Sequence, residues 1–503
     1  MDDSSPQALS VAKTPWEIVT SRFEFPAEVA PGIPFIPHPE QIRAINELAA
    51  LNNQGHWMDV GTGKTFMATA VALYLHIMYG TFAMCVMPPH LTLQWYRWLR
   101  KVTDKLTGEP ITVTLYAGPP KKREEIKLGG AQFYISSIRM FVKDMSRFRT
   151  LGKSKAYYII DEAHLILTNI ETKQFAAMAE MLPAERVAAL TGTPNATPLK
   201  AYGLIRFTAP GTYRSFAHFK REHVDTVDFW GKPQTFKNLD GIRDALATNS
   251  CRLLYSDMYS DLDVPKFMPM EYSLSKDHRK LYRKIASEKV RETSDGGKED
   301  STQVSKLFHN LGQVVVNFGH FAGDPEKKSE VIRVIRNYMD SIGDEKVVFF
   351  AHYQLTVALM CSEFADLGFV PYNGAVSDKD KDANKTRFMT DPSCRGIVIQ
   401  YRSGSSGLDG LQYASYRMLM VEPGDPNSPD VFIQCVGRLM RRGQQRQVCV
   451  GLLQARGTLQ PDRYTGLVNA DKLASKMLRP GFSLEKELGL DISDDDGWID
   501  YGD

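Results

Sequence analysis

Short apolar runs alternate with longer amphipathic segments along most of this chain, in two separate series. The runs are Phe82–Met87, Phe133–Ile135, Tyr157–Ile160 and Arg186–Leu190, then Val347–Phe350, Gly396–Tyr401, Arg417–Val421 and Val448–Leu453. Strands that alternate with helices predict parallel sheets covered by helices. A single core stops growing at roughly 250–300 residues, so a chain of 503 residues needs more than one. The expected fold class is α/β, with two tandem parallel-sheet lobes.

Between the two series, the sequence from about 200 to 313 is mostly helical and polar. We therefore expect an N-terminal lobe over residues 1–265 with a helical insertion at about 199–260. A C-terminal lobe over 266–460 with an insertion at about 271–325 follows, and 461–503 form an extension. The stretch 485–503 holds eight acidic residues and one lysine, whereas the whole chain carries +2. This acidic tail is either a solvated end or an autoinhibitory mimic of nucleic acid.

Cysteine usage and the N-terminal residues favour a cytoplasmic protein. No two of the six cysteines form a CxxC pair, which leaves zinc ribbons and redox motifs unsupported. Free, scattered cysteines suit a reducing compartment, and the first ten residues do not resemble a signal peptide. The apolar stretch Met67–Met87 has the length of a membrane span. Gly80-Thr81 interrupts it, so we expect a buried helix, a turn and a parallel strand, and no membrane partner.

A glycine-rich motif, MDVGTGKT, occupies Met58–Thr65. It matches the end of a P-loop, although Met58 stands where the full pattern has its first glycine. Such glycines let backbone N–H groups turn toward phosphates, the lysine reaches the β- and γ-phosphates, and the threonine hydroxyl binds Mg²⁺. The alternative is a glycine-rich turn that happens to precede a lysine. The candidate nucleotide contacts are Gly61, Thr62, Gly63, Lys64 and Thr65.

A second motif, YYIIDEAH, places two adjacent carboxylates directly after an apolar strand. Ligand crevices of α/β sheets form at such carboxyl ends. Asp161 can hold Mg²⁺, and Glu162 can act as the base for an attacking water or orient it. His164 can couple the site to neighbouring motifs. The alternative is a strand followed by an acidic helix start, but that alternative weakens once MDVGTGKT lies about a hundred residues upstream.

The order of the motifs resembles that of superfamily 2 helicases and translocases: GTGKT, DEAH, TGTP at Thr191–Pro194, and QCVGRLMRRGQ at Gln434–Gln444. The segment Thr191–Phe219 and the ending RxGQ are similar to the SWI/SNF-like branch, whose members track along double-stranded DNA. The resemblance runs from about residue 39 to 453. It implies two RecA-like lobes, a nucleic-acid-dependent ATPase activity, and ATP and Mg²⁺ as cofactors.

The resemblance also implies roles for individual residues of the first lobe. Gln41 matches the glutamine that reads adenine, which an amide can do with two hydrogen bonds. Trp95 fits a core side chain better than a base-stacking platform. Thr191 and Thr193 are expected to link the ATP state to the grip on nucleic acid. The residues expected to contact nucleic acid are Pro88, Gln94, Ser136, Ser137, Thr191, Thr193 and, in the second lobe, Ser403.

In the second lobe, Arg438 and Arg441 are the candidate arginine fingers, which stabilise charge on a transferring phosphoryl group. They are three residues apart, which predicts one helix face. Gly407, Asp409 and Gln434 complete the candidate cofactor contacts. Asp409 stands where the family usually has asparagine, and an aspartate beside a phosphate would repel it.

These motifs together predict an ATP-dependent motor that translocates on double-stranded DNA, with ATP hydrolysis at the interface of two lobes. Phosphate contacts carry no sequence information, so we expect the protein to bind DNA without sequence specificity. We also expect the motor to be a monomer. The sequence shows motor motifs and no recognisable accessory module, which is compatible with a protein from a compact microbial or viral genome. If the source is viral, we expect the protein in the cytoplasm of the host. Two alternatives stay open: a strand-separating superfamily 2 DNA or RNA helicase, and a catalytically silent nucleic-acid-binding scaffold.

Overall fold

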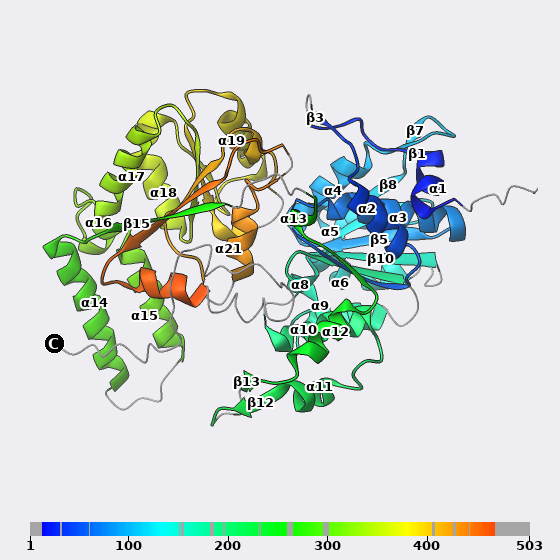
Figure 1. Ribbon diagram of the computed structural model, residues 1–503, viewed down its shortest axis with the longest axis horizontal. Helices are drawn as coiled ribbons and strands as arrows, with labels where there is room; N and C mark the ends of the chain where they lie inside the picture. Colours follow the sequence, from blue (N-terminus) through cyan, green and yellow to red (C-terminus); the bar gives the residue numbers. More distant parts are fainter. Residues whose placement is uncertain are drawn as a thin grey trace, which may run out of the picture. The chain divides into compact units, whose positions relative to one another are not determined.

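The computed structural model divides the chain into two compact units, residues 1–258 and 259–503. It describes residues 13–30, 33–59, 61–149, 151, 155–181, 186–194, 197–229, 231, 233–258, 265–294, 301–404, 408–425, 429–441 and 443–467. Each unit is an α/β layer structure built on a parallel sheet (Figure 1). The expected fold class is therefore confirmed.

The first unit contains a seven-stranded sheet in the order β14-β4-β11-β10-β5-β9-β8. All neighbours in it are parallel. Its strands are β4 (Asn53–Met58), β5 (Phe82–Met87), β8 (Val113–Tyr116), β9 (Phe133–Ser137), β10 (Ala156–Asp161), β11 (Arg186–Thr191) and β14 (Ser250–Leu253). Because the strands are parallel, their carboxyl ends share one edge of the sheet, and the residues that follow β4, β5, β9, β10 and β11 come together there.

Helices cover both faces of this sheet, with α2 and α3 on one side and α6 and α9 on the other (Figure 1). The helices are α1 (Pro15–Arg22), α2 (Pro39–Leu48), α3 (Lys64–Tyr79), α4 (Thr92–Leu99), α5 (Pro120–Glu125), α6 (Ile138–Lys143), α7 (Met145–Arg149), α8 (Ala163–Ile166) and α9 (Lys173–Met181). The apolar stretch Met67–Met87, which has the length of a membrane span, forms most of α3, a turn at Gly80 and strand β5. Within the part of the chain that the structure describes, no helix has the length and apolarity that crossing a bilayer requires.

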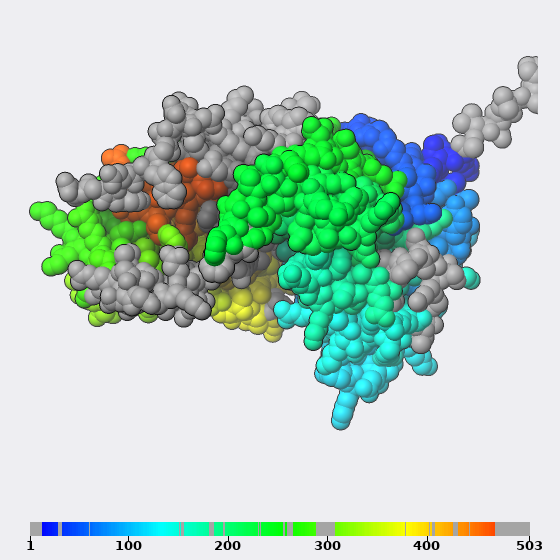
Figure 2. Space-filling model, turned by 90° about the horizontal axis from the view of Figure 1, so that it is seen from below, coloured from blue at the N-terminus to red at the C-terminus, as the bar shows by residue number. Residues whose placement is uncertain are grey.

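The segment expected as a helical insertion contains α10 (Pro198–Thr208), α11 (Phe216–His223), α12 (Leu239–Ala247) and α13 (Tyr255–Met258). It also contains a hairpin, β12 (Val224–Val227) with β13 (Pro233–Phe236), and its end returns to the sheet as edge strand β14. Figure 2 shows this segment, in green, as a continuous surface of the first unit. This segment is thus mostly helical, and it also contains short strands that the polar sequence did not predict.

The second unit contains a six-stranded sheet in the order β15-β20-β19-β16-β18-β17. All neighbours are again parallel. The strands are β15 (Lys266–Tyr272), β16 (Val347–Ala351), β17 (Val370–Tyr372), β18 (Gly396–Gln400), β19 (Arg417–Met420) and β20 (Cys449–Ala455). Val348 and Phe350 belong to one apolar cluster and Val347 and Phe349 to another. Since successive strand residues face opposite sides, both faces of this sheet are buried, as parallel sheets require.

The helices of the second unit are α14 (Lys276–Ser294), α15 (Ser301–Val314), α16 (Phe318–Ala322), α17 (Glu330–Ser341), α18 (Gln354–Glu363), α19 (Asp378–Thr390), α20 (Tyr401–Gly404) and α21 (Pro429–Val436). Three of them, α14 to α16, lie within the range 271–325. The acidic tail at 485–503 lies outside the described residues.

A glycine holds α10 close to the chain that follows the DEAH motif. A Cβ at Gly203 would overlap the carbonyl oxygen of Leu167, next to α8. We expect Gly203→Ala to lower the free energy of unfolding by about 1–3 kcal/mol, the usual cost of overpacking, although alanine favours a helix. Chemical denaturation measures this cost. Arg206→Ala on the exposed side of the same helix is the control, and equal stability of both variants would contradict the close approach.

Candidate nucleotide site

The candidate P-loop lies between the end of β4 and the start of α3. Gly61 and Gly63 have φ values of 87° and 90°, which only glycine adopts readily. The Lys64 ammonium donates hydrogen bonds to the carbonyl oxygens of Met58 and Asp59, at 2.8 and 3.1 Å. The loop therefore wraps around its own lysine at the N-terminus of a 16-residue helix, where anions are favoured.

Gln41 lies against this loop rather than on an exposed helix face. It is 6% exposed, and its Nε2 donates to the carbonyl oxygen of Thr62 at 2.6 Å. Its Oε1 accepts from the backbone N–H of His38 at 2.9 Å. A Cβ at Gly63 would overlap the same amide nitrogen. The structure thus brings the candidate adenine-reading residue and the P-loop together, and the reading of adenine itself stays a prediction.

Asp161 ends β10, two strands along the sheet from β4, and Glu162 follows it. Burial of Asp161 and then the nearby Glu162 charge raise the pKa of Asp161 to about 6, against the lowering effect of Trp95 and Lys64. A carboxylate that has lost solvent beside a second carboxylate is stabilised by a cation. Asp161 therefore fits a magnesium ligand, and the expected role of Thr65 at the start of α3 stays a prediction.

Glu162 adopts a left-handed conformation, with φ 49° and ψ 49°. Such strained backbone at a non-glycine residue is typical of functional sites. Its Oε2 lies 3.3 Å from Nδ1 of His164, and the same nitrogen lies 2.9 Å from Oγ1 of Thr191. Thr191 Oγ1 also accepts from the N–H of Thr193 at 3.0 Å. The DEAH and TGTP motifs are thus joined by one continuous set of polar contacts, which suits the link expected of both threonines.

The expected nucleic-acid contacts differ widely in exposure. Gln94 is exposed, and Thr193 and Ser403 are half-buried. The buried ones are Pro88, Ser136, Ser137 and Thr191. Ser137 caps α6, because its Oγ accepts from the N–H of Met140. In this structure Gln94 is therefore the member of the set that presents its side chain most fully to solvent.

In the second unit, Arg438 and Arg441 do not share a helix face, and that expectation was wrong. Helix α21 ends at Val436, and the next N–H bonds, such as Arg438 to Cys435, are those of tight turns. Gly437, which disfavours helix, stands directly after the helix end. Gln434, inside α21, is 3% exposed.

The two arginines are instead held by the loop that contains Asp409. Arg438 is 4% exposed, and its Nη1 donates to the carbonyl oxygen of Leu408 at 2.7 Å. Arg441 donates from Nη1 to Oδ1 of Asp409 at 2.8 Å and from Nε to the carbonyl of Gly437 at 3.0 Å. Desolvation opposes ionisation of Asp409, but Arg441 outweighs it and lowers the pKa of Asp409 to about 2. The positive charge of Arg441 thus offsets the expected repulsion between Asp409 and a phosphate. Gly407, the other candidate of this loop, lies outside the described residues.

Two contacts of the candidate site were missed by reasoning from the sequence. Trp95 belongs to the core, as expected, but its Nε1 donates to Oδ2 of Asp161 at 2.7 Å. The Asp409–Arg441 ion pair joins residues 32 positions apart. No local pattern signals either contact, because each depends on how the strands and loops pack.

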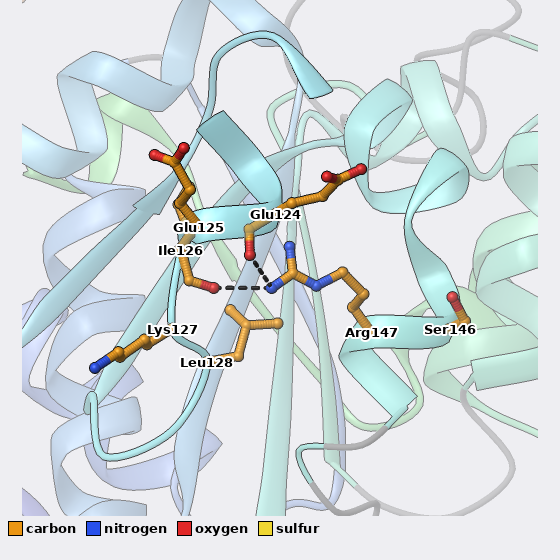
Figure 3. Close-up of a pocket in the computed structure, with 7 residues that line it drawn as sticks. All are labelled: Glu124, Glu125, Ile126, Lys127, Leu128, Ser146 and Arg147. Atoms are coloured by element: carbon orange, nitrogen blue, oxygen red, sulfur yellow. Dashed lines mark hydrogen bonds between the residues drawn. The ribbon is translucent and has the colours of Figure 1, made fainter. Parts of the chain in front are cut away.

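A cavity of about 560 Å³ is lined by residues outside these motifs, and Figure 3 shows its lining residues. Its lining residues come from the end of α5, the chain after it, and α7, beside the β8–β9 edge of the sheet. Arg147 donates to the carbonyl oxygens of Glu124 and Ile126 there. This arginine completes the end of a helix, and the cavity carries no part of the candidate site.

Comparisons with known proteins show the family of this chain. The sequence profile of the SNF2-related domain matches residues 41–317. The SWI/SNF-related matrix-associated actin-dependent regulator of chromatin subfamily A-like protein 1 of Xenopus tropicalis is 24% identical over 411 residues, 80% of this chain and 40% of the relative. The DNA repair and recombination protein RDH54 of Saccharomyces cerevisiae (strain YJM789) is 24% identical over 371 residues, 66% of this chain and 39% of that protein.

Among solved structures, the Pyrococcus furiosus Hef helicase domain aligns with a TM-score of 0.52 and 15% identity, over 85% of this chain and 97% of that domain. This likeness shows the fold and supports the two RecA-like lobes. The chain spans about two fifths of the length of the curated relatives it matches. Because the matching profile covers more than half of its residues, the chain belongs to the SNF2-related domain family.

Proposed function

We propose that this protein is an ATP-dependent motor that translocates on double-stranded DNA. The observation that carries the proposal is the electrostatic interaction of Lys64, after β4, with the buried Asp161 at the carboxyl end of β10, in a chain of the SNF2-related family. Relatives named for chromatin regulation and for DNA repair and recombination support duplex DNA as the track.

The P-loop and the DEAH motif provide the chemistry of hydrolysis. When bound, Mg²⁺ neutralises charge on the phosphates of ATP. Gly61, Thr62 and Gly63 turn backbone N–H groups toward these phosphates, and Lys64 contacts them directly. Thr65 and Asp161 would hold the metal. Glu162 takes the proton of the attacking water or orients it.

The second unit supplies the charge that completes the reaction. Arg438 and Arg441 act on the γ-phosphate of the nucleotide that the first unit binds, while Gln41 reads its adenine. Gly407, Asp409 and Gln434 support the same nucleotide. Because the arginines attract the γ-phosphate only before hydrolysis, the nucleotide state shifts the balance between a closed and an open arrangement of the units. That alternation becomes stepwise movement when both units grip DNA.

The grip on DNA uses phosphate contacts and carries no sequence specificity. Gln94, Thr193 and Ser403 are the candidates whose side chains reach solvent. The buried candidates position the backbone that contacts the DNA strand; they are Pro88, Ser136, Ser137 and Thr191. We further propose a monomeric motor that works in the cytoplasm, in the host's cytoplasm if the source is viral.

ATP hydrolysis measured with no polymer, single-stranded DNA, duplex DNA and RNA tests this proposal. Strong stimulation by duplex DNA alone supports it. Preferential stimulation by single strands or RNA favours the strand-separating helicase instead. No hydrolysis under any condition leaves a nucleic-acid-binding scaffold and overturns the proposed activity.

A further inference from the structure

The side chain of Trp95 joins helix α4 to the DEAH motif. Its indole N–H donates to Oδ2 of Asp161 at 2.7 Å, and the two residues are 1% and 6% exposed. The other carboxylate oxygen, Oδ1, accepts from the backbone N–H of Glu162 at 2.9 Å. Each oxygen of Asp161 thus has one fixed donor. These two bonds set the rotation of the carboxylate and so determine which lone pairs remain for a metal ion.

The choice of partner distinguishes Trp95 from other tryptophans of the same unit. A buried indole N–H usually finds some acceptor, and neutral groups serve elsewhere. Trp57 donates to the carbonyl oxygen of Leu246 at 2.7 Å, and Trp98 donates to Oγ1 of Thr69 at 3.2 Å. Trp95 alone among these three donates to a carboxylate, and bonds to charged acceptors are about twice as strong as neutral ones. The bond from Trp95 to Asp161 therefore does more than give a buried indole N–H an acceptor.

The position of Trp95 along α4 adds a second connection. Gln94, the exposed candidate contact for nucleic acid, precedes it on the same eight-residue helix. The two side chains therefore leave α4 toward solvent and toward the sheet, respectively. A displacement of this short helix moves the donor that orients Asp161.

We propose that Trp95 is a positioning residue, whose indole N–H orients Asp161 for Mg²⁺ and ties this carboxylate to helix α4. This inference rests on the proposed ATPase function. Partners that orient a metal ligand typically contribute about 10–100-fold in metal affinity or activity. Loss of the indole N–H is therefore expected to weaken Mg²⁺ binding, with little effect on nucleotide binding without metal.

The test measures equilibrium binding of a fluorescent ADP analogue by the full chain, titrated with Mg²⁺, so that no turnover is needed. For Trp95→Phe we expect about 10–100-fold more Mg²⁺ at half-saturation, and unchanged ADP affinity in EDTA. Trp98→Phe, on the same helix but bonded to Thr69, is the matched control and should titrate as the unaltered protein does. Equal Mg²⁺ requirements of the two variants would overturn the proposal.

Two further measurements separate positioning from packing and from failure of the proposed function. Benzothienylalanine at position 95 keeps the ring shape but replaces the N–H by sulfur; it should reproduce the Mg²⁺ defect even if Trp95→Phe unfolds. Normal Mg²⁺ binding by the protein with this analogue would contradict the inference.

Unaltered protein that binds ADP without any response to Mg²⁺ would instead overturn the proposed ATPase site, and the inference with it. ATPase assays at saturating Mg²⁺ should restore kcat in Trp95→Phe, as a metal-affinity defect requires.

Discussion

Glu162→Gln is expected to lower kcat for ATP hydrolysis by about 10²–10⁴-fold, the usual contribution of a general base. The amide keeps the size of the side chain but cannot accept a proton from water. Nucleotide binding should persist, because Lys64 and Asp161 are untouched. Steady-state hydrolysis gives kcat, and equilibrium binding of a fluorescent nucleotide gives affinity.

The matched control is Glu171→Gln, an exposed glutamate of the same unit, which should hydrolyse ATP normally. A thermal melt of both variants checks that the change at position 162, where the backbone is left-handed, does not unfold the protein. If Glu162→Gln retained full kcat, Glu162 would have no part in activating water, and the assignment of the DEAH carboxylates would fail.

Arg438→Ala and Arg441→Ala are each expected to lower kcat by about 10³-fold or more, as removal of an arginine finger does. The affinity for nucleotide should change little, because the P-loop lies in the first unit. Arg438→Ala should also lower stability, since its buried guanidinium holds the carbonyl of Leu408. Separate measurements of kcat, nucleotide affinity and thermal stability resolve these effects.

Arg446→Ala, at a more exposed arginine paired with Glu345, is the control and should leave kcat nearly unchanged. Asp409→Asn adds a sharper comparison, because it removes the charge that pairs with Arg441 and keeps the side-chain size. A loss of nucleotide affinity with unchanged kcat in both arginine variants would show that these residues bind ground-state ATP only, against a role in the transition state.

The sequence predicts the sheets well where strands are apolar on both faces. All eight apolar runs are strands, from β5 to β20. Strand β4 was missed because it carries Gln54 and His56, both fully buried. Gln54 accepts from the Tyr157 hydroxyl at 2.6 Å and lies 2.9 Å from the His56 ring, and burial lowers the pKa of His56 to about 3. A polar strand whose side chains bond to one another has no apolar pattern to recognise.

The parts of the candidate site that are formed by contiguous residues could be predicted from the sequence. Residues 61–65 and residues 161–164 are each contiguous in the sequence, so the local sequence determines most of their geometry. The contacts of Trp95 with Asp161 and of Asp409 with Arg441 join distant segments, and only packing creates them. The expected helix face of Arg438 and Arg441 failed for a local reason, because the helix ends at Val436, just before Gly437.

Displacement of a third DNA strand from a duplex tests the central claim most directly. A triplex-forming oligonucleotide is bound to one end of a linear duplex, and its release is followed with and without ATP, beside Glu162→Gln. A motor that tracks along double-stranded DNA releases the third strand in an ATP-dependent manner, leaves the duplex intact, and loses this ability in the variant. ATP hydrolysis without release, or separation of the duplex strands themselves, would contradict translocation on double-stranded DNA.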